Sequence, residues 1–246
     1  MVNHQEHEVS NGVVLIAFGG PSSSGKTTVA RTIQSLIPQK TKLIHLDDFY
    51  LTDSKIPIDS KTGYQNWDCP EALDFKKFKK YLVGLKNGEE PISVESIQPK
   101  DTDLKLNEEE SSQIRHVIDS NLKKFDNKKI VFVDGFMLFH DPSIIKLFDI
   151  SLFFHATFDT LKTRRDARKG YNTAEGFWVD PPNYFKSIVW PAYEESHKHL
   201  FIDDDINKNL KPDLLKTYKI KELNNGESQN LFSLVTNALN FIIDNL

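Results

Sequence analysis

The stretch Gly20-Pro-Ser-Ser-Ser-Gly25-Lys26-Thr27 decides the fold of this chain, because it matches the phosphate-loop pattern G-x-x-x-x-G-K-[ST] at every fixed position. An apolar run rich in β-branched residues precedes it at 13–18, and a helix-like run follows at 28–36. A strand that turns on glycines into a helix start points backbone N–H groups at one place, where the helix dipole adds positive potential. The motif therefore predicts a polyphosphate site; a Gly/Ser-rich turn that matches by chance is the alternative.

Each polar residue type of the loop has a task in nucleotide binding. Lys26 can reach the β- and γ-phosphates, and the Thr27 hydroxyl can ligate Mg²⁺. The residues that we expect to contact ATP here are Gly20, Ser22, Ser23, Ser24, Gly25, Lys26, Thr27 and Thr28.

Length and composition indicate one α/β domain over residues 1–246, with a loose N-terminal tail at 1–11. A net charge of −4 argues against a nucleic-acid surface. Cys69 is the only cysteine, so no intrachain disulfide can form and a reducing compartment is the natural setting. We read no signal peptide and no apolar run of the roughly 20 residues that span a bilayer. The expected location is the cytoplasm, with the nucleus possible, and we expect no membrane partner.

Apolar periodicity predicts short strands separated by helices. Strands are expected at 13–18, 42–46, 130–133, 149–155 and 218–223. Helices are expected at 28–36, from Pro70 onwards with Phe75, Phe78, Leu82 and Leu85 on one face, after an N-cap at Asn107-x-x-Glu110, at 157–169, in part of 182–200 with Pro191 as a kink or break, and at 231–246. The pattern predicts a central, mostly parallel five-stranded sheet flanked by helices. We expect an acceptor-side excursion at about 51–126 and a lid at about 157–182.

Two carboxylates follow predicted strands and are candidates for the chemistry. Asp134 ends a buried apolar run. In phosphate-loop proteins an acidic residue at this place helps to bind Mg²⁺ together with the Ser/Thr hydroxyl of the loop; a polar residue that only caps the strand is the alternative. Asp47 ends the strand after the phosphate-loop helix, at the active edge of an open α/β sheet. Its carboxylate could accept a proton from an acceptor hydroxyl or orient it, whereas a simple Asp-Asp turn is the alternative.

Basic residues gather on the helix predicted at 157–169. Arg164 and Arg168 share a face at i and i+4, and arginines stabilise charge on a transferring phosphoryl group. Such a helix could close over the nucleotide as a lid, although a solvated cationic face is the alternative. The acidic run at 203–205 is interpreted as an exposed turn rather than a metal site.

A GTPase switch is excluded by specific residues. The guanine-reading pattern N-K-x-D fails because Ile130 stands at its last position after Asn127-Lys128. The D-x-x-G switch element is also missing at Asp134.

With these residues assembled, most of 13–200 resembles the nicotinamide riboside kinases, which are relatives of the uridine kinases. The resemblance rests on several spaced motifs: Ser24-Gly25-Lys26-Thr27-Thr28, Asp47-Asp48-Phe49-Tyr50, Gln65-Asn66-Trp67-Asp68, Val133-Asp134-Gly135-Phe136, Arg164-Arg165-x-x-Arg168, Phe177-Trp178-Val179-Asp180-Pro181-Pro182, and Val189-Trp190-Pro191-x-Tyr193. Fungal members look closest. Animal members carry Glu at the place of Asp134 and Tyr at that of Trp67.

The resemblance implies a P-loop kinase fold and a role for each matched position. Asp47 would act as the base toward the substrate 5′-hydroxyl, with Lys26 and Arg164 as the other catalytic groups. Thr27, Asp47 and Asp134 would hold Mg²⁺, and Arg164 and Arg168 would contact ATP. Trp67 and Tyr171 would sandwich the nicotinamide ring, Asp68 and Arg165 would bind the ribose hydroxyls, and Phe49 would also contact the nucleoside. The segment 224–226 would lie near the adenine.

The resemblance implies transfer of the ATP γ-phosphate to nicotinamide riboside, with ATP and a small nucleoside as the only partners of a monomer or weak homodimer. The pyridinium ring of that nucleoside is cationic, and an aromatic face attracts a cation by roughly 0.5 to 2 kcal/mol. Stacking alone cannot exclude uridine. A uridine or cytidine kinase and a nucleotide-binding regulator without turnover therefore remain as alternatives.

Overall fold

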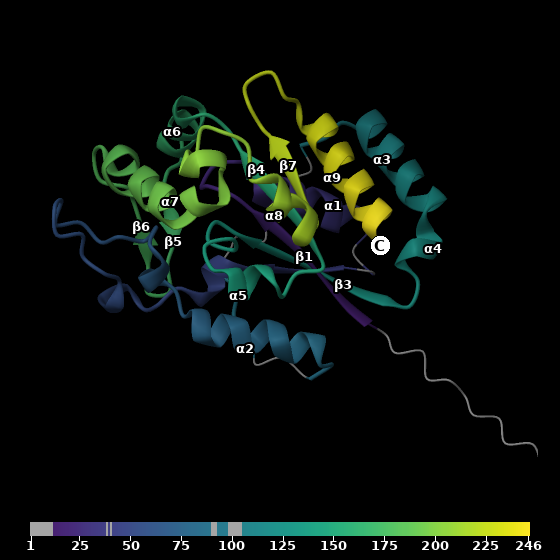
Figure 1. Cartoon of the computed structure of the whole chain (residues 1–246), viewed down its shortest axis with the longest axis horizontal. Coiled ribbons are helices and arrows are strands. Elements are labelled where there is room, and N and C mark those ends of the chain that lie inside the picture. Colours follow the sequence, from purple (N-terminus) through teal and green to yellow (C-terminus); the bar gives the residue numbers. More distant parts are fainter. Residues whose placement is uncertain (1–11, 38, 40, 90–92, 98–104) are drawn as a thin grey trace, which may run out of the picture.

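A five-stranded sheet forms the centre of the molecule, as the alternation of strands and helices predicted. The computed structural model describes residues 12–37, 39, 41–89, 93–97 and 105–246. Every neighbouring pair of strands in this sheet runs parallel, in the order β2-β3-β1-β4-β7 (Figure 1). The strands are β2 (Thr41–His45), β3 (Lys128–Gly135), β1 (Gly12–Gly19), β4 (Ile150–His155) and β7 (Ile220–Asn224).

The register of the sheet brings the carboxyl ends of its central strands together. Gly19 at the end of β1 pairs with Gly135 at the end of β3, and His45 at the end of β2 pairs with Asp134. In an open parallel sheet the loops beyond these ends form the ligand-binding edge. The segments after β1, β2 and β3 therefore converge at one place.

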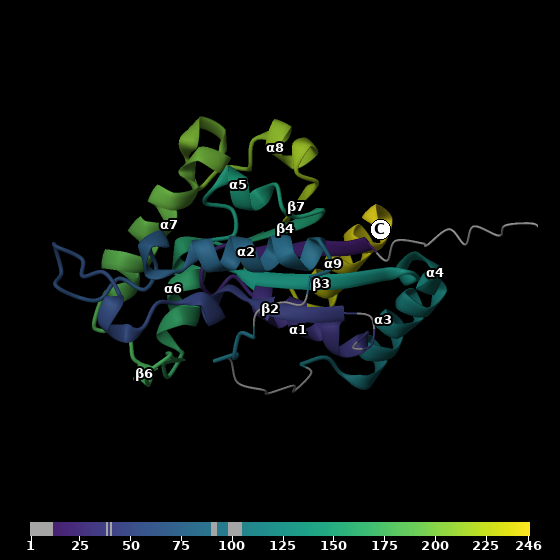
Figure 2. The same ribbon diagram turned by 90° about the horizontal axis from the view of Figure 1, so that it is seen from below.

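Helices cover both faces of the sheet. One face packs against α1 (Lys26–Leu36), α3 (Glu108–Ser120), α4 (Leu122–Phe125) and α9 (Leu231–Asn245). The other face packs against α2 (Phe75–Lys86), α5 (Pro142–Ile145), α7 (Trp190–His197) and α8 (Pro212–Thr217). Figure 2 shows α1 and α3 on one side of the strands and α5, α7 and α8 on the other. Because both faces are covered, the central strands read as nearly continuous apolar runs.

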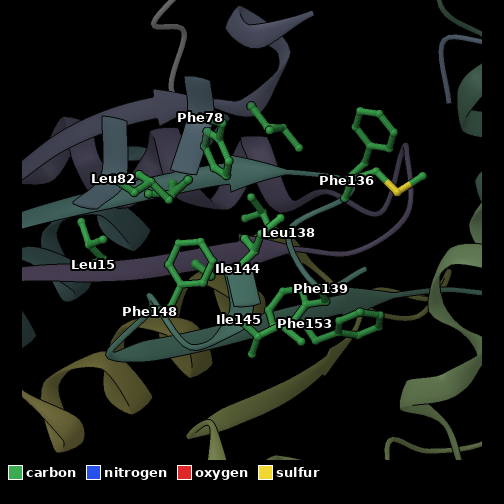
Figure 3. Packing of buried hydrophobic residues seen from close by; sticks show 14 of the residues in the cluster. Leu15, Phe78, Leu82, Phe136, Leu138, Phe139, Ile144, Ile145, Phe148 and Phe153 are labelled. Carbon is green, nitrogen blue, oxygen red and sulfur yellow. The ribbon is translucent and has the colours of Figure 1, made fainter. Parts of the chain in front are cut away.

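The core beneath α2 is dense in aromatic side chains. Figure 3 shows Phe78 of α2 in the same cluster as Ile144 of α5 and Phe153 of β4. Each of these three side chains is fully buried. Burial of a side chain of this size stabilises a fold by about 1.5 to 3 kcal/mol, so this cluster holds α2 and α5 firmly against the sheet.

The segment predicted to form a lid is a short helix followed by a hairpin. Helix α6 (Phe158–Asp166) begins after Thr157, whose hydroxyl accepts from the Thr160 N–H, and it ends three residues earlier than the basic run suggested. Strands β5 (Tyr171–Asn172) and β6 (Phe177–Trp178) then pair antiparallel. Gly170, with φ +140°, separates helix from hairpin, and a Cβ there would lie 2.5 Å from the Trp178 carbonyl oxygen.

Several predicted boundaries were wrong for identifiable reasons. Pro70 opens a 3-10 turn (Pro70–Ala72), and α2 starts only at Phe75 because the Asp74 carboxylate caps the Lys77 N–H. Strand β2 stops at His45, since Leu46 begins another 3-10 turn (Leu46–Phe49). Pro191 does not end a helix: the π-helical turn (Phe185–Val189) continues directly into α7, and Pro191 lies next to this change from π- to α-helix.

Other expectations of local structure were confirmed. Asn107 and Glu110 form the reciprocal cap at the start of α3. The run at 203–205 is a surface turn, in which Asp203 and Asp204 pair with Lys208 and Lys211. The tail at 1–11 lies outside the described residues. In the described part of the chain, no helix is both long and apolar enough to cross a membrane.

Candidate active site

The phosphate loop, residues 20–25, joins β1 to α1 in a conformation that needs its glycines. Gly20 has φ +133° and Gly25 has φ +91°, a region that favours glycine. A Cβ on Gly20 would also lie 2.0 Å from the Phe154 carbonyl oxygen. Among the described residues no side chain caps the start of α1, and the buried Ser23 and Ser24 hydroxyls have no hydrogen-bond partner. Such an uncapped helix start with unpaired donors fits an anion.

Lys26 is a buried cation at this cradle. Its side chain is nearly enclosed, and its Nζ lies 3.4 Å from the Pro21 carbonyl oxygen, a long hydrogen bond. Burial lowers the pKa of Lys26, while the charges of Asp134 and Asp47 oppose that shift. An anion that binds beside Lys26 would favour its protonated form, because the lysine has little other hydrogen bonding to stabilise its charge.

His45 and Asp134 form a buried pair that the strand register creates. The His45 Nδ1 and Asp134 Oδ2 atoms are 3.0 Å apart. Burial alone would raise the pKa of Asp134, but His45 and Lys26, helped by the Thr27 hydroxyl, bring it below its ordinary value. The other oxygen, Oδ1, is buried and has no hydrogen-bond partner among the described residues.

Asp47 lies beside this pair in the 3-10 turn after β2. Burial, reinforced by the charge of Asp134, raises the pKa of Asp47 to about 6, although Lys26 opposes the shift. A carboxylate with a pKa near 6 is ionised at neutral pH and still basic enough to take a proton.

The Thr27, Asp47 and Asp134 side chains fit a magnesium ion. Asp47 and Asp134 are buried carboxylates that repel one another, and one oxygen of Asp134 has no hydrogen-bond partner among the described residues. A divalent cation between them would reduce the repulsion and coordinate that oxygen. Mg²⁺ is typically bound by one or two carboxylates plus phosphates and water. The described residues contain no group of three or more His, Cys, Asp or Glu side chains that could hold a metal ion by themselves.

One cavity of about 510 Å³ connects the phosphate loop to an aromatic region. Of the predicted site residues, the structure brings the following to its wall: Ser22, Lys26, Thr27, Thr28, Asp47, Trp67, Asp68, Asp134, Arg165, Arg168 and Tyr171. Lys26 and Asp47 therefore line the same cavity, as they must if Asp47 is to act on an acceptor next to the phosphates.

Aromatic rings form the wall at the far end of the cavity. Trp67 contacts Tyr50 edge-on, with ring centroids 5.4 Å apart, and Trp178, with centroids 5.7 Å apart. All three residues line the cavity. The ring of Tyr171 lies 4.8 Å from the guanidinium carbon of Arg165 and 5.4 Å from that of Arg168. This end can present π faces to a flat ring.

Arg165 is saturated with hydrogen bonds inside the protein. Its Nε and Nη2 donate to the Asp180 carboxylate at 2.7 and 3.1 Å. Its Nη1 and Nη2 donate to Asp68 at 2.9 and 3.2 Å, and Nη1 also donates to the Ser22 hydroxyl at 3.0 Å. These contacts use all five N–H donors of a guanidinium. In this conformation every N–H of Arg165 is used within the protein, and its predicted contact with a ribose hydroxyl stays a prediction.

Six predicted residues do not line this cavity. Four of them belong to the phosphate loop itself: Gly20, Ser23, Ser24 and Gly25. The other two are Phe49 and Arg164. Phe49 is in the core, where its ring packs edge-on against Phe78 and Tyr81, because the 3-10 turn directs Tyr50 toward the cavity in its place. Arg164 donates to the Asn225 carbonyl oxygen at 2.9 Å, and the Asn225 amide donates to the Ser24 carbonyl oxygen at 2.9 Å. The predicted contact of Arg164 with ATP stays a prediction.

Sequence reasoning assigned no role to four residues of this region: His45, Tyr50, Trp178 and Asp180. Trp178 and Asp180 belong to a motif of the resemblance, and Trp178 Nε1 donates to Asp180 Oδ1 at 2.9 Å. The sequence signal that could have pointed to them is that both follow Arg165 within 15 positions. No local pattern marks His45 as the partner of a residue 89 positions away.

Comparisons with known proteins show the family of this chain. The model of the phosphoribulokinase / uridine kinase family matches residues 15–175. The chain is 40% identical over 222 residues to the nicotinamide riboside kinase of Saccharomyces cerevisiae, covering 89% of this chain and 90% of the relative. It is 37% identical to that of Schizosaccharomyces pombe, covering 80% and 84%. It is 32% identical to that of Eremothecium gossypii, covering 95% and 94%. Identity of this extent over most of each chain shows that the protein belongs to the nicotinamide riboside kinases, within the phosphoribulokinase and uridine kinase family.

Proposed function

We propose that this chain transfers the γ-phosphate of ATP to the 5′-hydroxyl of nicotinamide riboside, giving nicotinamide mononucleotide and ADP. The observation that carries the proposal is a single cavity lined both by Lys26 and Asp47 and by the rings of Trp67, Trp178 and Tyr171. The first group of residues suits a triphosphate and an alcohol, and the second suits a flat ring.

The phosphate loop holds the donor in this scheme. Its backbone N–H groups and the hydroxyls of Ser23 and Ser24 surround the phosphates, and Lys26 balances charge on the β- and γ-phosphates. Thr27, Asp47 and Asp134 would hold Mg²⁺, which when bound neutralises charge on the transferring phosphoryl group. The buried Asp134 Oδ1 supports that assignment.

Asp47 acts on the acceptor. The 5′-oxygen forms a bond to the γ-phosphorus while the bond from that phosphorus to the β,γ-bridging oxygen breaks. The hydroxyl proton passes to the Asp47 carboxylate, whose pKa of about 6 suits a proton acceptor at neutral pH. Because phosphoryl transfer has a loose transition state, orientation of the hydroxyl by Asp47 contributes as well.

The nicotinamide ring would lie among the aromatic residues. The pyridinium is cationic, and each aromatic face attracts a cation by roughly 0.5 to 2 kcal/mol. The carboxylate of Asp68, which already accepts from Arg165, keeps lone pairs for a ribose hydroxyl.

The test is turnover by the purified chain. With ATP, Mg²⁺ and nicotinamide riboside we expect nicotinamide mononucleotide and ADP in equal amounts, measured by liquid chromatography and mass spectrometry. No mononucleotide at enzyme concentrations equal to the substrate would refute the proposal.

Uridine or cytidine phosphorylation is the second candidate, because the matching family model includes uridine kinases. A competition assay with equal concentrations of nicotinamide riboside and uridine separates the two. We expect the charged nucleoside to be consumed first; preferential consumption of uridine would assign the chain to the second activity. A regulator without turnover is disfavoured by membership of a kinase family.

A further inference from the structure

Two carboxylates surround one guanidinium behind the aromatic end of the cavity. Asp68 and Asp180 bind opposite edges of Arg165, each through two hydrogen bonds. The side chains of Arg165 and Asp68 are about 5% exposed, and that of Asp180 is 21% exposed. One negative charge of this triad is therefore not balanced within it.

Asp180 supplies that surplus charge without lining the cavity itself. It is separated from the cavity by two residues that do line it, Arg165 and Trp178, and it accepts a hydrogen bond from each. Trp178 in turn contacts Trp67, with ring centroids 5.7 Å apart. The charge of Asp180 thus lies directly behind the rings that form the aromatic wall.

Burial makes this charge effective at a distance. Charges in a partly buried site are screened far less than those in water, so one carboxylate acts on a cation in the neighbouring cavity. Without Asp180, Asp68 would only balance Arg165. Arg168 also lies at this wall, with its guanidinium carbon 5.4 Å from the centroid of the Tyr171 ring, so the wall without Asp180 would carry a net positive charge that repels a cation.

We propose that Asp180 makes the nucleoside end of the cavity selective for a cationic ring over a neutral ring of the same shape. This inference rests on the proposed function, and it assigns the choice of substrate to a charge behind the rings in addition to the rings themselves. Asp180 is a specificity-determining residue that acts through space and through Arg165 and Trp178, and it does not touch the substrate.

The test compares two nucleosides that differ in charge and little in shape. Nicotinamide riboside carries a pyridinium, whereas its 1,4-dihydro form is neutral and keeps the same carboxamide and ribose. The dissociation constants of both are measured by calorimetry for the wild-type chain and for Asp180→Asn. We expect the preference for the cation to fall about ten-fold in Asp180→Asn, which corresponds to about 1.4 kcal/mol. The loss should come from weaker binding of the cation.

A purely structural role would give a different pattern. If Asp180→Asn weakened both nucleosides by the same factor, the residue would only hold Arg165 and Trp178 in place, and the proposal would be wrong. Asp166→Asn is the matched control, because it removes the same formal charge from the residue next to Arg165. Its carboxylate pairs with Lys162 at the surface, so the preference should not change.

A second variant decides the matter if Asp180→Asn does not fold. Asp180→Glu keeps the charge and displaces the hydrogen bonds. We expect its preference for the cation to stay within about two-fold of wild type even where both affinities fall. A preference lost with the charge retained would overturn the inference.

Failure of the proposed function gives a separate result. If the wild-type chain binds neither nucleoside and forms no mononucleotide, the function is refuted. If the wild-type chain turns over nicotinamide riboside and Asp180→Asn keeps the full preference, only the inference about Asp180 falls.

Discussion

The two ends of the cavity are built differently. At the phosphate end, the buried hydroxyls of Ser23 and Ser24 and one oxygen of Asp134 have no hydrogen-bond partner among the described residues. At the nucleoside end, Trp67 Nε1 and the Tyr171 hydroxyl are likewise unpaired, but Arg165 uses every N–H on protein partners and Trp67 is packed among other rings. The phosphate end therefore depends more on its ligand, whereas the nucleoside end depends more on packing and on one fully paired guanidinium. Substitutions should therefore affect chemistry at one end and stability or affinity at the other.

The largest effect is expected for Asp47→Asn, which keeps the shape of the side chain and removes its basicity. Loss of a general base reduces the rate on the order of 10³-fold. Initial rates of mononucleotide formation measure it. Asp48→Asn is the control, since that carboxylate accepts from Ser96 and the Ile97 N–H rather than facing the phosphate loop. Equal losses in both variants would remove Asp47 from the chemistry.

Arg165→Met tests the claim that the nucleoside end depends on one fully paired guanidinium. Breaking a buried ion pair leaves Asp68 charged and unpaired, and this destabilises by roughly 3 kcal/mol, more than a 10²-fold change in the unfolding equilibrium. Urea unfolding followed by tryptophan fluorescence measures the change without substrate. A stability equal to wild type would mean that the guanidinium contributes nothing to the fold, and the contrast between the two ends would fail.

Trp67→Leu removes a π face while keeping an apolar side chain in the wall. We expect the KM for nicotinamide riboside to rise about ten-fold with little change in kcat, as for loss of one cation–π contact of about 1.4 kcal/mol. The KM for ATP serves as the internal control and should stay constant. A lowered kcat with constant KM for the nucleoside would place Trp67 outside the ring site.

The smallest effect on stability is the most direct test of the comparison. Lys26→Met removes a buried cation whose one side-chain hydrogen bond among the described residues is long, so the unliganded protein should become more stable by about 1 kcal/mol while turnover falls on the order of 10²-fold. Thermal unfolding without ATP measures the stability, and unfolding with ATP measures the loss of binding, because ATP should stabilise wild type and not the variant. Initial rates of mononucleotide formation measure turnover. Destabilisation of the unliganded variant would show that Lys26 supports the fold.

The same contrast explains what the sequence could predict. The phosphate loop is one contiguous motif, and the strand before it and the helix after it made the positions of Lys26 and Thr27 predictable. The nucleoside end depends on contacts between distant residues: Asp68 lies 97 positions from Arg165, and Ser22 lies 143 positions from it. A resemblance named Arg165 as a ligand of the ribose, but no pattern could reveal that its donors are already used.

The direction in which a side chain points was the other feature that the sequence could not predict. Phe49 and Tyr50 share one motif, and only Phe49 was predicted to contact the nucleoside, yet the 3-10 turn brings Tyr50 to the cavity wall. The pairing of His45 with Asp134 similarly follows from strand register, which a single sequence does not specify for strands so far apart.

The hydrogen bond between Ser22 and Arg165 has a consequence for the order of events. Ser22 belongs to the loop that would receive the triphosphate, and Arg165 also binds Asp68, the residue proposed to contact the ribose. A shift of Ser22 on binding of the donor would therefore reach Asp68 through the side chain of Arg165. By thermodynamic linkage, the factor by which ATP changes the affinity for the nucleoside equals the factor by which the nucleoside changes the affinity for ATP. One serine hydroxyl thus gives the two substrates a route by which each can sense the other before any bond is made.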